Sequence, residues 1–224
     1  MKKNICWLGL LIVSAVIFAG CAASGMKNVE KTGFLSDYSQ LQAGGSDRAA
    51  LYYMKSGVNL QPYDKIMFDR VVVMLSDDAE YHVVDPATLK EMTDYYQKAL
   101  LDAVQDGYQV VDQPGPGVLR VRVAITELKP SKPVANTMST IIPVGMVAAG
   151  ATKAISGDNL GTGEASTEFE LLDSLSGERL AAAVDRRQGG KAVFRGKWED
   201  TKDAFDFWAK RFRERLDEAR GVSK

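Results

Sequence analysis

Residues that could act as a nucleophile or a general base are scarce in this sequence. Its one histidine, His82, lies in the polar stretch SDDAEYHVVDP, residues 76–86. Serine and cysteine nucleophiles need a neighbouring base, most often histidine, and the G-x-S-x-G pattern is absent. The 29 acidic residues offer many pairs of the kind that cleave glycosidic bonds, but no pair stands out. We therefore expect no catalytic residue, with a cell-wall or lipid hydrolase that uses carboxylates as the alternative.

Metal and phosphate chemistry also lack a motif. His82 and the nearby Asp77, Asp78 and Glu80 could form a weak metal site, but a solvated loop explains the same residues. The H-E-x-x-H, Walker and Rossmann motifs are missing. We expect no metal and no small-molecule cofactor.

The best candidate for a contact surface is TMSTIIPVGMVAAGATKAIS, residues 137–156, here called the apolar segment. No residue between Lys132 and Lys153 is charged, which is unusual for a solvent loop. A proline and two glycines interrupt it, so we do not predict a membrane span. It is an arm that contacts a membrane or a partner, a small-residue helix packed on the domain, or a mobile loop. As an arm, it would make contact through Ile141, Ile142, Met146 and Val147.

Phe207 is a second candidate contact residue. It lies roughly opposite the apolar stripe of a predicted C-terminal helix, and Arg211 follows one turn later. It is either a partner contact or a partly covered surface aromatic.

The N-terminal residues carry the clearest chemical signal. Lys2 and Lys3 precede about 14 uncharged, mostly apolar residues, Ile5 to Phe18. This run is short for a membrane-spanning helix, which needs roughly 20 residues, and suits a secretory signal. The Ala-Gly-Cys that ends at Cys21 resembles the lipobox of bacterial lipoproteins. An uncleaved anchor, or an ordinary signal peptide with a chance cysteine, would be the alternative.

The lipobox resemblance implies that residues 1–20 are removed and that Cys21 receives a diacylglycerol and an N-linked acyl chain. Two or more acyl chains hold a protein firmly to a bilayer. In lipoproteins of this kind an aspartate after the cysteine favours the inner membrane, so Ala22 implies the outer membrane. We expect the domain to face the periplasm, with residues 21–33 as a flexible tether.

Charge and cysteine content limit the partners further. The chain has 28 basic and 29 acidic residues, and without Lys2 and Lys3 the balance is 26 against 29, or −3. Nucleic-acid binding needs a basic surface, so we expect no such partner. Since Cys6 lies in the leader and Cys21 is the lipid site, we expect no disulfide. Residues 34–219 suit a single domain, followed by a tail at 220–224.

A mixed sheet would position these residues. A β-branched run at 65–75, a helix capped by Asp85 and a short strand at 108–112 predict a βαβ unit with parallel strands. The helix would end near Gly107. Its apolar face consists of Leu89, Met92, Tyr96, Leu100, Ala103 and Val104.

Alternating apolar and polar residues predict three further strands, at 118–128, 164–173 and 179–187. The last two would form an antiparallel hairpin. Arg120 and Arg122 would face Glu168 and Glu170 across neighbouring strands, or else bind an anion.

A helix at about 199–219, capped by Asp200, completes the predicted domain. Its apolar stripe is Phe205, Trp208, Ala209, Phe212, Leu216 and Ala219. Residues 34–62 would be extended chain on the domain, pinned by Tyr38, Tyr52 and Tyr53. The predicted class is α+β, a mixed β-sheet with one βαβ crossover, an antiparallel hairpin and helices on one face.

Several stretches resemble a known family of lipoproteins from Gram-negative bacteria, domain-of-unknown-function family 3313 (DUF3313). They are GFLSDYSQL, YDKIMFDRVVV, GYQVVDQPGPGVLRVRVAITEL, TGEASTEFELLDSLSGERLAAAVDRR and AFDFWAKRFRERLD, within residues 33–219. The resemblance supports the lipobox and the outer membrane but implies no catalytic residues. We expect a non-enzymatic, lipid-anchored module that binds or scaffolds an envelope protein. A periplasmic lipid carrier is a further alternative.

Overall fold

A computed structural model describes residues 29–75, 84–131, 163–189 and 196–222. The strands are β1 (Gln42–Ala43), β2 (Leu51–Met54), β3 (Lys65–Phe68), β4 (Val72–Val73), β5 (Gln109–Val110), β6 (Val118–Lys129), β7 (Glu164–Asp173) and β8 (Arg179–Gln188). The helices are α1 (Pro86–Val104) and α2 (Glu199–Arg220). The predicted α+β class is confirmed.

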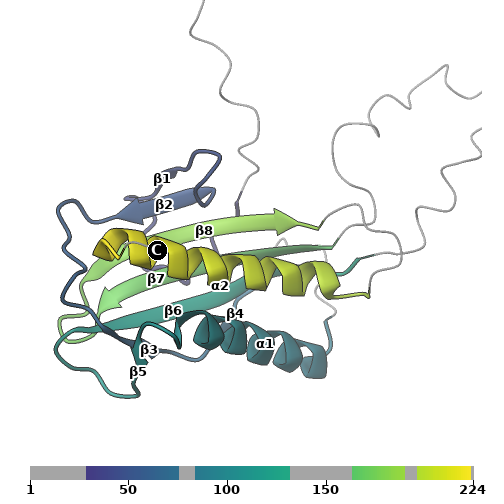
Figure 1. The fold of residues 1–224 in the computed structure, drawn as a ribbon. Coiled ribbons are helices and arrows are strands. Elements are labelled where there is room, and N and C mark those ends of the chain that lie inside the picture. The colour runs from purple at the N-terminus through teal and green to yellow at the C-terminus, as the bar shows by residue number, and fades with distance from the viewer. Residues whose placement is uncertain (1–28, 76–83, 132–162, 190–195, 223–224) are drawn as a thin grey trace, which may run out of the picture.

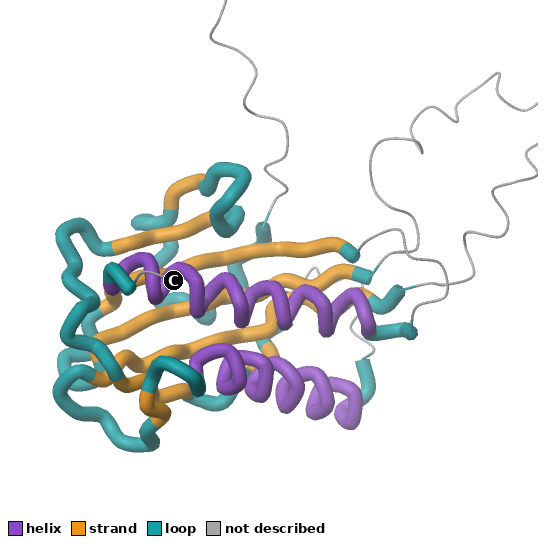
Figure 2. The backbone as a smooth tube through the Cα atoms, in the orientation of Figure 1, coloured by secondary structure: helices purple, strands orange, loops and turns teal. Residues whose placement is uncertain are grey.

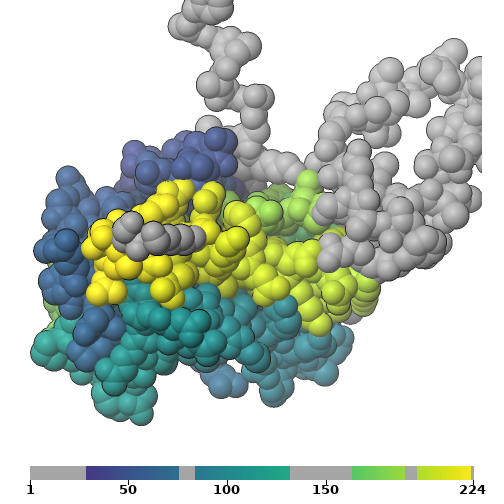
Figure 3. All heavy atoms as spheres, viewed as in Figure 1, coloured from purple at the N-terminus to yellow at the C-terminus, as the bar shows by residue number. Residues whose placement is uncertain are grey.

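Eight strands form one mixed sheet, in the order β1-β2-β8-β7-β6-β3-β5, with β4 also paired to β6. Both helices lie side by side on one face of this sheet (Figure 1). In the space-filling view, α2 runs between α1 and the β1–β2 segment (Figure 3). This two-layer arrangement buries the apolar faces of sheet and helices against each other.

The predicted βαβ unit is present, because β3 and β5 are parallel and α1 lies between them in the chain. The prediction of a single strand at 65–75 is wrong, because residues 69–71 interrupt it and separate β3 from β4. At the break the Asp69 carboxylate binds Arg120, and the backbone N–H of Val71 donates to the Gln97 side chain at 3.0 Å. The strand expected at 108–112 shortens to two residues.

Helix α1 begins as predicted. The Asp85 side chain accepts a hydrogen bond from the Thr88 N–H at 2.9 Å, which satisfies one free donor of the first turn. The helix ends at Val104, before Gly107. The residues of its predicted face are buried or pack against the core.

Strands β6, β7 and β8 form the long antiparallel centre of the sheet, and the predicted hairpin of β7 and β8 is confirmed. A bulge between Ile125 and Glu127 shifts the register of β6 against β7. The extra residue, Thr126, is buried, although its place in the alternation predicted an outward side chain. An extra residue in one strand reverses the faces beyond it, which a simple period of two does not anticipate.

The core between sheet and helices is aromatic. The rings of Tyr96 in α1 and Phe205 in α2 stack with centroids 4.4 Å apart, and the Trp208 ring lies 6.1 Å from each. Aromatic pairs of this kind add packing energy beyond the burial of their area. Most of the predicted α2 stripe is buried or packs on the core, but Ala219 is exposed, which corrects the prediction.

The N-terminal residues cover part of the opposite face of the sheet. Leu35 is buried there against Ala182 and Val184 of β8. Further apolar side chains pack around them, from Val29, Phe34, Tyr38, Leu41, Leu51 and Tyr53. The described end of the predicted tether, residues 29–33, therefore lies on the sheet.

Candidate functional site

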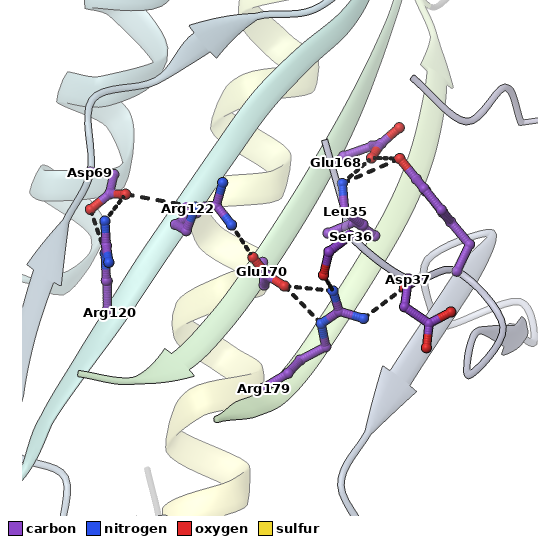
Figure 4. A network of polar contacts seen from close by, with 10 residues as sticks. Leu35, Ser36, Asp37, Asp69, Arg120, Arg122, Glu168, Glu170 and Arg179 are labelled. Atoms are coloured by element: carbon purple, nitrogen blue, oxygen red, sulfur yellow. Dashed lines mark hydrogen bonds and ion pairs between the residues drawn. The ribbon is translucent and has the colours of Figure 1, made fainter. Parts of the chain in front are cut away.

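Residues 29–38, here called the strap, hold the most unusual polar contact in the structure. The strap crosses the sheet face opposite the helices, next to Glu168 of β7 (Figure 4). Glu168 is fully buried, with 0% of its surface exposed. A carboxylate in such a place must have its charge satisfied by donors.

The strap supplies those donors. Glu168 Oε1 accepts hydrogen bonds from the Thr32 N–H at 2.9 Å and the Thr32 hydroxyl at 3.0 Å. Its Oε2 accepts from the Tyr38 hydroxyl at 2.5 Å and the Leu35 N–H at 3.3 Å. A carboxylate has about four lone-pair positions, so the strap fills them. Each hydrogen bond to a charged group contributes about 1.5–3 kcal/mol.

Tyr38 donates to this carboxylate as a neutral phenol. Burial raises the pKa of its hydroxyl, and the hydrogen bond to Glu168 and the negative charge there raise it further. The proton on Tyr38 therefore stays in place at neutral pH, which keeps the shortest of the four contacts intact.

A second group of charges lies beside Glu168 on the same face (Figure 4). Glu170 binds Arg122 and Arg179, and it is almost fully buried. Arg179 also donates to the Asp37 carbonyl at 2.7 Å and to the Ser36 hydroxyl at 3.1 Å, so it joins β8 to the strap.

The predicted pairing of the two β6 arginines is half right. Arg122 lies opposite Glu170 in the register, as expected. Arg120 instead binds Asp69 with two hydrogen bonds, 2.8 and 2.7 Å long. Asp69 can reach Arg120 because strand β3 ends at Phe68. The prediction had placed Asp69 inside a continuous strand. These contacts occupy the arginines and favour the ion-pair explanation over an anion site.

At one end of the sheet, Asp200 lies among the ends of three strands and binds two of the adjoining residues. Its Oδ2 accepts hydrogen bonds from the Ser131 hydroxyl after β6, at 2.7 Å, and from the Gly163 N–H before β7, at 2.9 Å. A Cβ on Gly189, after β8, would lie 2.0 Å from Asp200 Cγ, so only glycine fits. The first turns of both helices lie at this same end (Figure 2).

Asp200 is therefore not the cap of α2, which corrects the prediction. Trp198 stands at the cap position, without a side-chain hydrogen bond, and Asp200 lies in the first turn. Its carboxylate points to the strand ends instead.

Most of the predicted contact residues lie outside the described residues. These are Cys21, Ile141, Ile142, Met146, Val147 and also His82. Phe207 is described, and its half-buried ring packs against the core. The Arg187 guanidinium lies 3.5 Å from the ring centroid and that of Arg211 lies 5.7 Å away. The ring is thus partly covered by its own chain.

The buried acids of the described residues serve the fold. Glu164 binds Arg186, and Asp217 accepts hydrogen bonds from Tyr108 and Arg213. With Glu168, Glu170 and Asp200, each already has donors from the same chain. A catalytic carboxylate needs a position open to substrate. Within the ranges described, no group of three potential metal ligands gathers, and no helix is long and apolar enough to cross a membrane.

A family model described as a protein of unknown function (DUF3313) matches residues 30–212, most of the chain and nearly all of the described domain. The chain belongs to this family. The resemblance inferred from the sequence is thereby confirmed, and the family description indicates no enzymatic activity. No curated protein matches the sequence.

Several solved structures are similar in outline. The PelC dodecamer of Paraburkholderia phytofirmans is 12% identical, with a TM-score of 0.39, over 71% of this chain and 96% of that one. A minor lipoprotein of Acinetobacter baumannii is 10% identical, with a TM-score of 0.34, over 70% and 95%. A lipoprotein of Neisseria meningitidis is 10% identical, with a TM-score of 0.34, over 69% and 98%.

Proposed function

We propose that this DUF3313 protein is anchored by acyl chains on Cys21 to the outer membrane, where it faces the periplasm. There it serves as a non-enzymatic module that binds or scaffolds an envelope protein. The observation that carries the proposal is the short interval between anchor and domain. Val29 already packs on the sheet, eight residues after Cys21. An anchor at Cys21 would therefore hold the domain close to the membrane surface.

Replacing the anchor residue tests the first half of the proposal. Cys21→Ser removes the thiol that would carry diacylglycerol, so we expect loss of palmitate labelling and an unprocessed or released protein. Metabolic labelling and separation of inner membrane, outer membrane and soluble fractions measure both. Cys6→Ser, which changes the other leader cysteine, is the matched control and should behave as wild type. A Cys21→Ser protein that remained acylated would refute lipid attachment at this residue.

Two observations support a binding role over catalysis. The buried carboxylates already have partners within the fold, and the sequence contains the apolar segment. Five buried carboxylates are bound by donors of the fold, which leaves the hydrolase alternative with little support. The lipid carrier alternative needs an apolar cavity between sheet and helices, where Tyr96, Phe205 and Trp208 instead pack together. The apolar segment lies between β6 and β7, outside the described residues.

Photocrosslinking in cells tests this role. We expect a photoreactive residue at Met146 to capture a discrete protein, while the same residue at exposed Lys210 on α2 captures none. Capture of lipid alone at Met146 would turn the segment into a membrane contact. Capture only within the protein itself would make it part of the packed domain.

A further inference from the structure

We propose that the strap sets the orientation of the domain on the membrane. The strap-covered face of the sheet lies toward the lipid surface, and the layer of α1 and α2 lies away from it. This inference rests on the proposed lipid anchor at Cys21. The domain would face a lipid surface. Glu168 is the residue that binds the strap to the sheet.

The length of the free chain is the first argument. Cys21 and Val29 are eight residues apart, so the chain between them spans at most about 29 Å. That is comparable to the thickness of the two layers, since a helix alone is about 10 Å across. A tether this short, fixed to one face, keeps that face nearest to its anchor.

The position of the docked strap is the second argument. Leu35 binds Glu168 on the face opposite the helices (Figure 4). Thr32 and Tyr38 donate hydrogen bonds to the same carboxylate. Arg179 adds two hydrogen bonds to Ser36 and Asp37. The strap is therefore attached to β7 and β8 on the sheet face that the helices do not cover.

Release of the strap would remove this constraint. The first residue then held on the sheet would be Leu41, 20 residues after Cys21. The free chain would reach about 72 Å when extended and about 25 Å on average. At that length the domain could turn either layer toward the lipid. Orientation thus depends on the contacts that hold the strap on the sheet, and the four hydrogen bonds that Glu168 accepts are a large part of them.

Spin labels on two sides of the full-length lipidated protein test the proposal. Because Cys21 is acylated and Cys6 is lost with the leader, an introduced cysteine is the one free thiol. We place it at Gln40, exposed in the turn after the strap, or at Lys210, exposed on α2. The protein is incorporated into phosphatidylethanolamine and phosphatidylglycerol vesicles that contain a nickel-chelating lipid. Relaxation by nickel reports proximity to the lipid surface.

We expect at least threefold greater relaxation at position 40 than at position 210. Equal relaxation, or greater relaxation at 210, would overturn the orientation. Protein that does not float with the vesicles would overturn the lipid anchor itself, and with it this inference. The two failures are thus distinguishable in one preparation.

Glu168→Gln tests the mechanism. It preserves size but removes the charge that the four donors satisfy, so we expect the ratio between the two positions to fall toward one. Glu127→Gln is the matched control, because Glu127 binds Ser166 and Arg186 on the same sheet and makes none of the strap contacts described. Tyr38→Phe is a milder variant and should give an intermediate ratio. A full ratio in folded Glu168→Gln protein would show that the strap does not orient the domain.

Discussion

At the scale of single residues, the acids of β7 show how one strand can hold three carboxylates out of water. Glu164, Glu168 and Glu170 are each at most 3% exposed. Glu164 binds Arg186 and Glu170 binds Arg122 and Arg179, so these two are held by cations. Glu168 is held by the hydroxyl and N–H groups of the strap. Its stabilisation therefore depends on a segment that precedes it by 130 to 136 residues.

Asp217 offers a test of pH dependence. It accepts hydrogen bonds from Arg213 Nε at 2.7 Å and from the Tyr108 hydroxyl at 2.8 Å. Burial alone would raise the pKa of this carboxyl. The hydrogen bonds, with the positive charges of Arg213 and Arg220, outweigh burial and hold it below its usual value of 3.8. A carboxyl with a lowered pKa stabilises the fold above its unfolded pKa and loses that contribution as pH falls through the folded one.

We therefore expect Asp217→Asn to unfold at lower urea concentration than wild type at pH 7. Between pH 5 and pH 2 its stability should fall less steeply than that of wild type, because one titrating group is gone. Urea unfolding at several pH values measures both slopes. Parallel slopes for the two proteins would contradict a lowered pKa at this residue.

How far single residues could be predicted depends on whether a regular pattern places their partners. The Asp85 cap followed from positions close in the chain, and the pair of Arg122 and Glu170 followed from the alternation of two adjacent strands. Asp200 did not, because its partners, Ser131 and Gly163, lie just outside strands β6 and β7, where no period places them. Glu168 was predicted to face an arginine. Its true partners in the strap lie 130 to 136 residues away, and periodicity carries no signal for them.

At the scale of elements, the two helices contact each other through aromatic side chains at the centre of the core. Phe205 is fully buried, and its ring stacks on Tyr96 with an angle of 5° between planes. Phe207, on the same helix, is only half-buried and is covered by arginines. Substitutions of these two phenylalanines therefore allow a core position to be compared with a partly exposed one.

We expect Phe205→Ala to lower the free energy of unfolding by about 3–5 kcal/mol, the usual cost of truncating a buried aromatic. Phe207→Ala should cost clearly less, since its ring leaves part of its surface in water. Chemical denaturation with circular dichroism measures both changes. Equal losses would mean that Phe207 is as much part of the core as Phe205.

Elements with a clear period were predicted well. Both helices and the strands β6, β7 and β8 lie within a few residues of their expected ranges. The 65–75 run failed because its β-branched residues fit a long strand, while Asp69 and the Gln97 side chain break it. Four-residue β2 was missed within 34–62, because so short a run shows no strong period and is stabilised by pairing with β8.

At the scale of the whole molecule, different parts of the chain cover the two faces of the sheet. The helices bury one face with apolar side chains, and the strap covers part of the other with both apolar side chains and hydrogen bonds. Both ends of the sheet are two-residue strands, β1 and β5. Short edge strands offer little backbone for pairing with another chain, so we expect partners to bind through side chains or the apolar segment.

Removing the apolar segment tests whether the domain needs it. Ser131 and Gly163 on either side of it are both bound by Asp200, so a short Gly-Ser bridge in place of 137–156 should leave the fold closed. We expect the midpoint of thermal unfolding to change by only a few degrees. Asp200→Ala in the otherwise intact chain is the comparison and should lower the midpoint more. A drop of many degrees on deletion would place the segment in the core.

The long span between the strap and Glu168 also sets an order of events. A chain is made from its N terminus, so Thr32 exists long before its partner on β7, which comes 136 residues later. Loop closure over such a distance costs entropy that only a formed sheet can repay. The strap therefore docks only after β7 has joined the sheet. Until then, the strap is not held on the sheet, and an enzyme that works on an extended peptide can reach it.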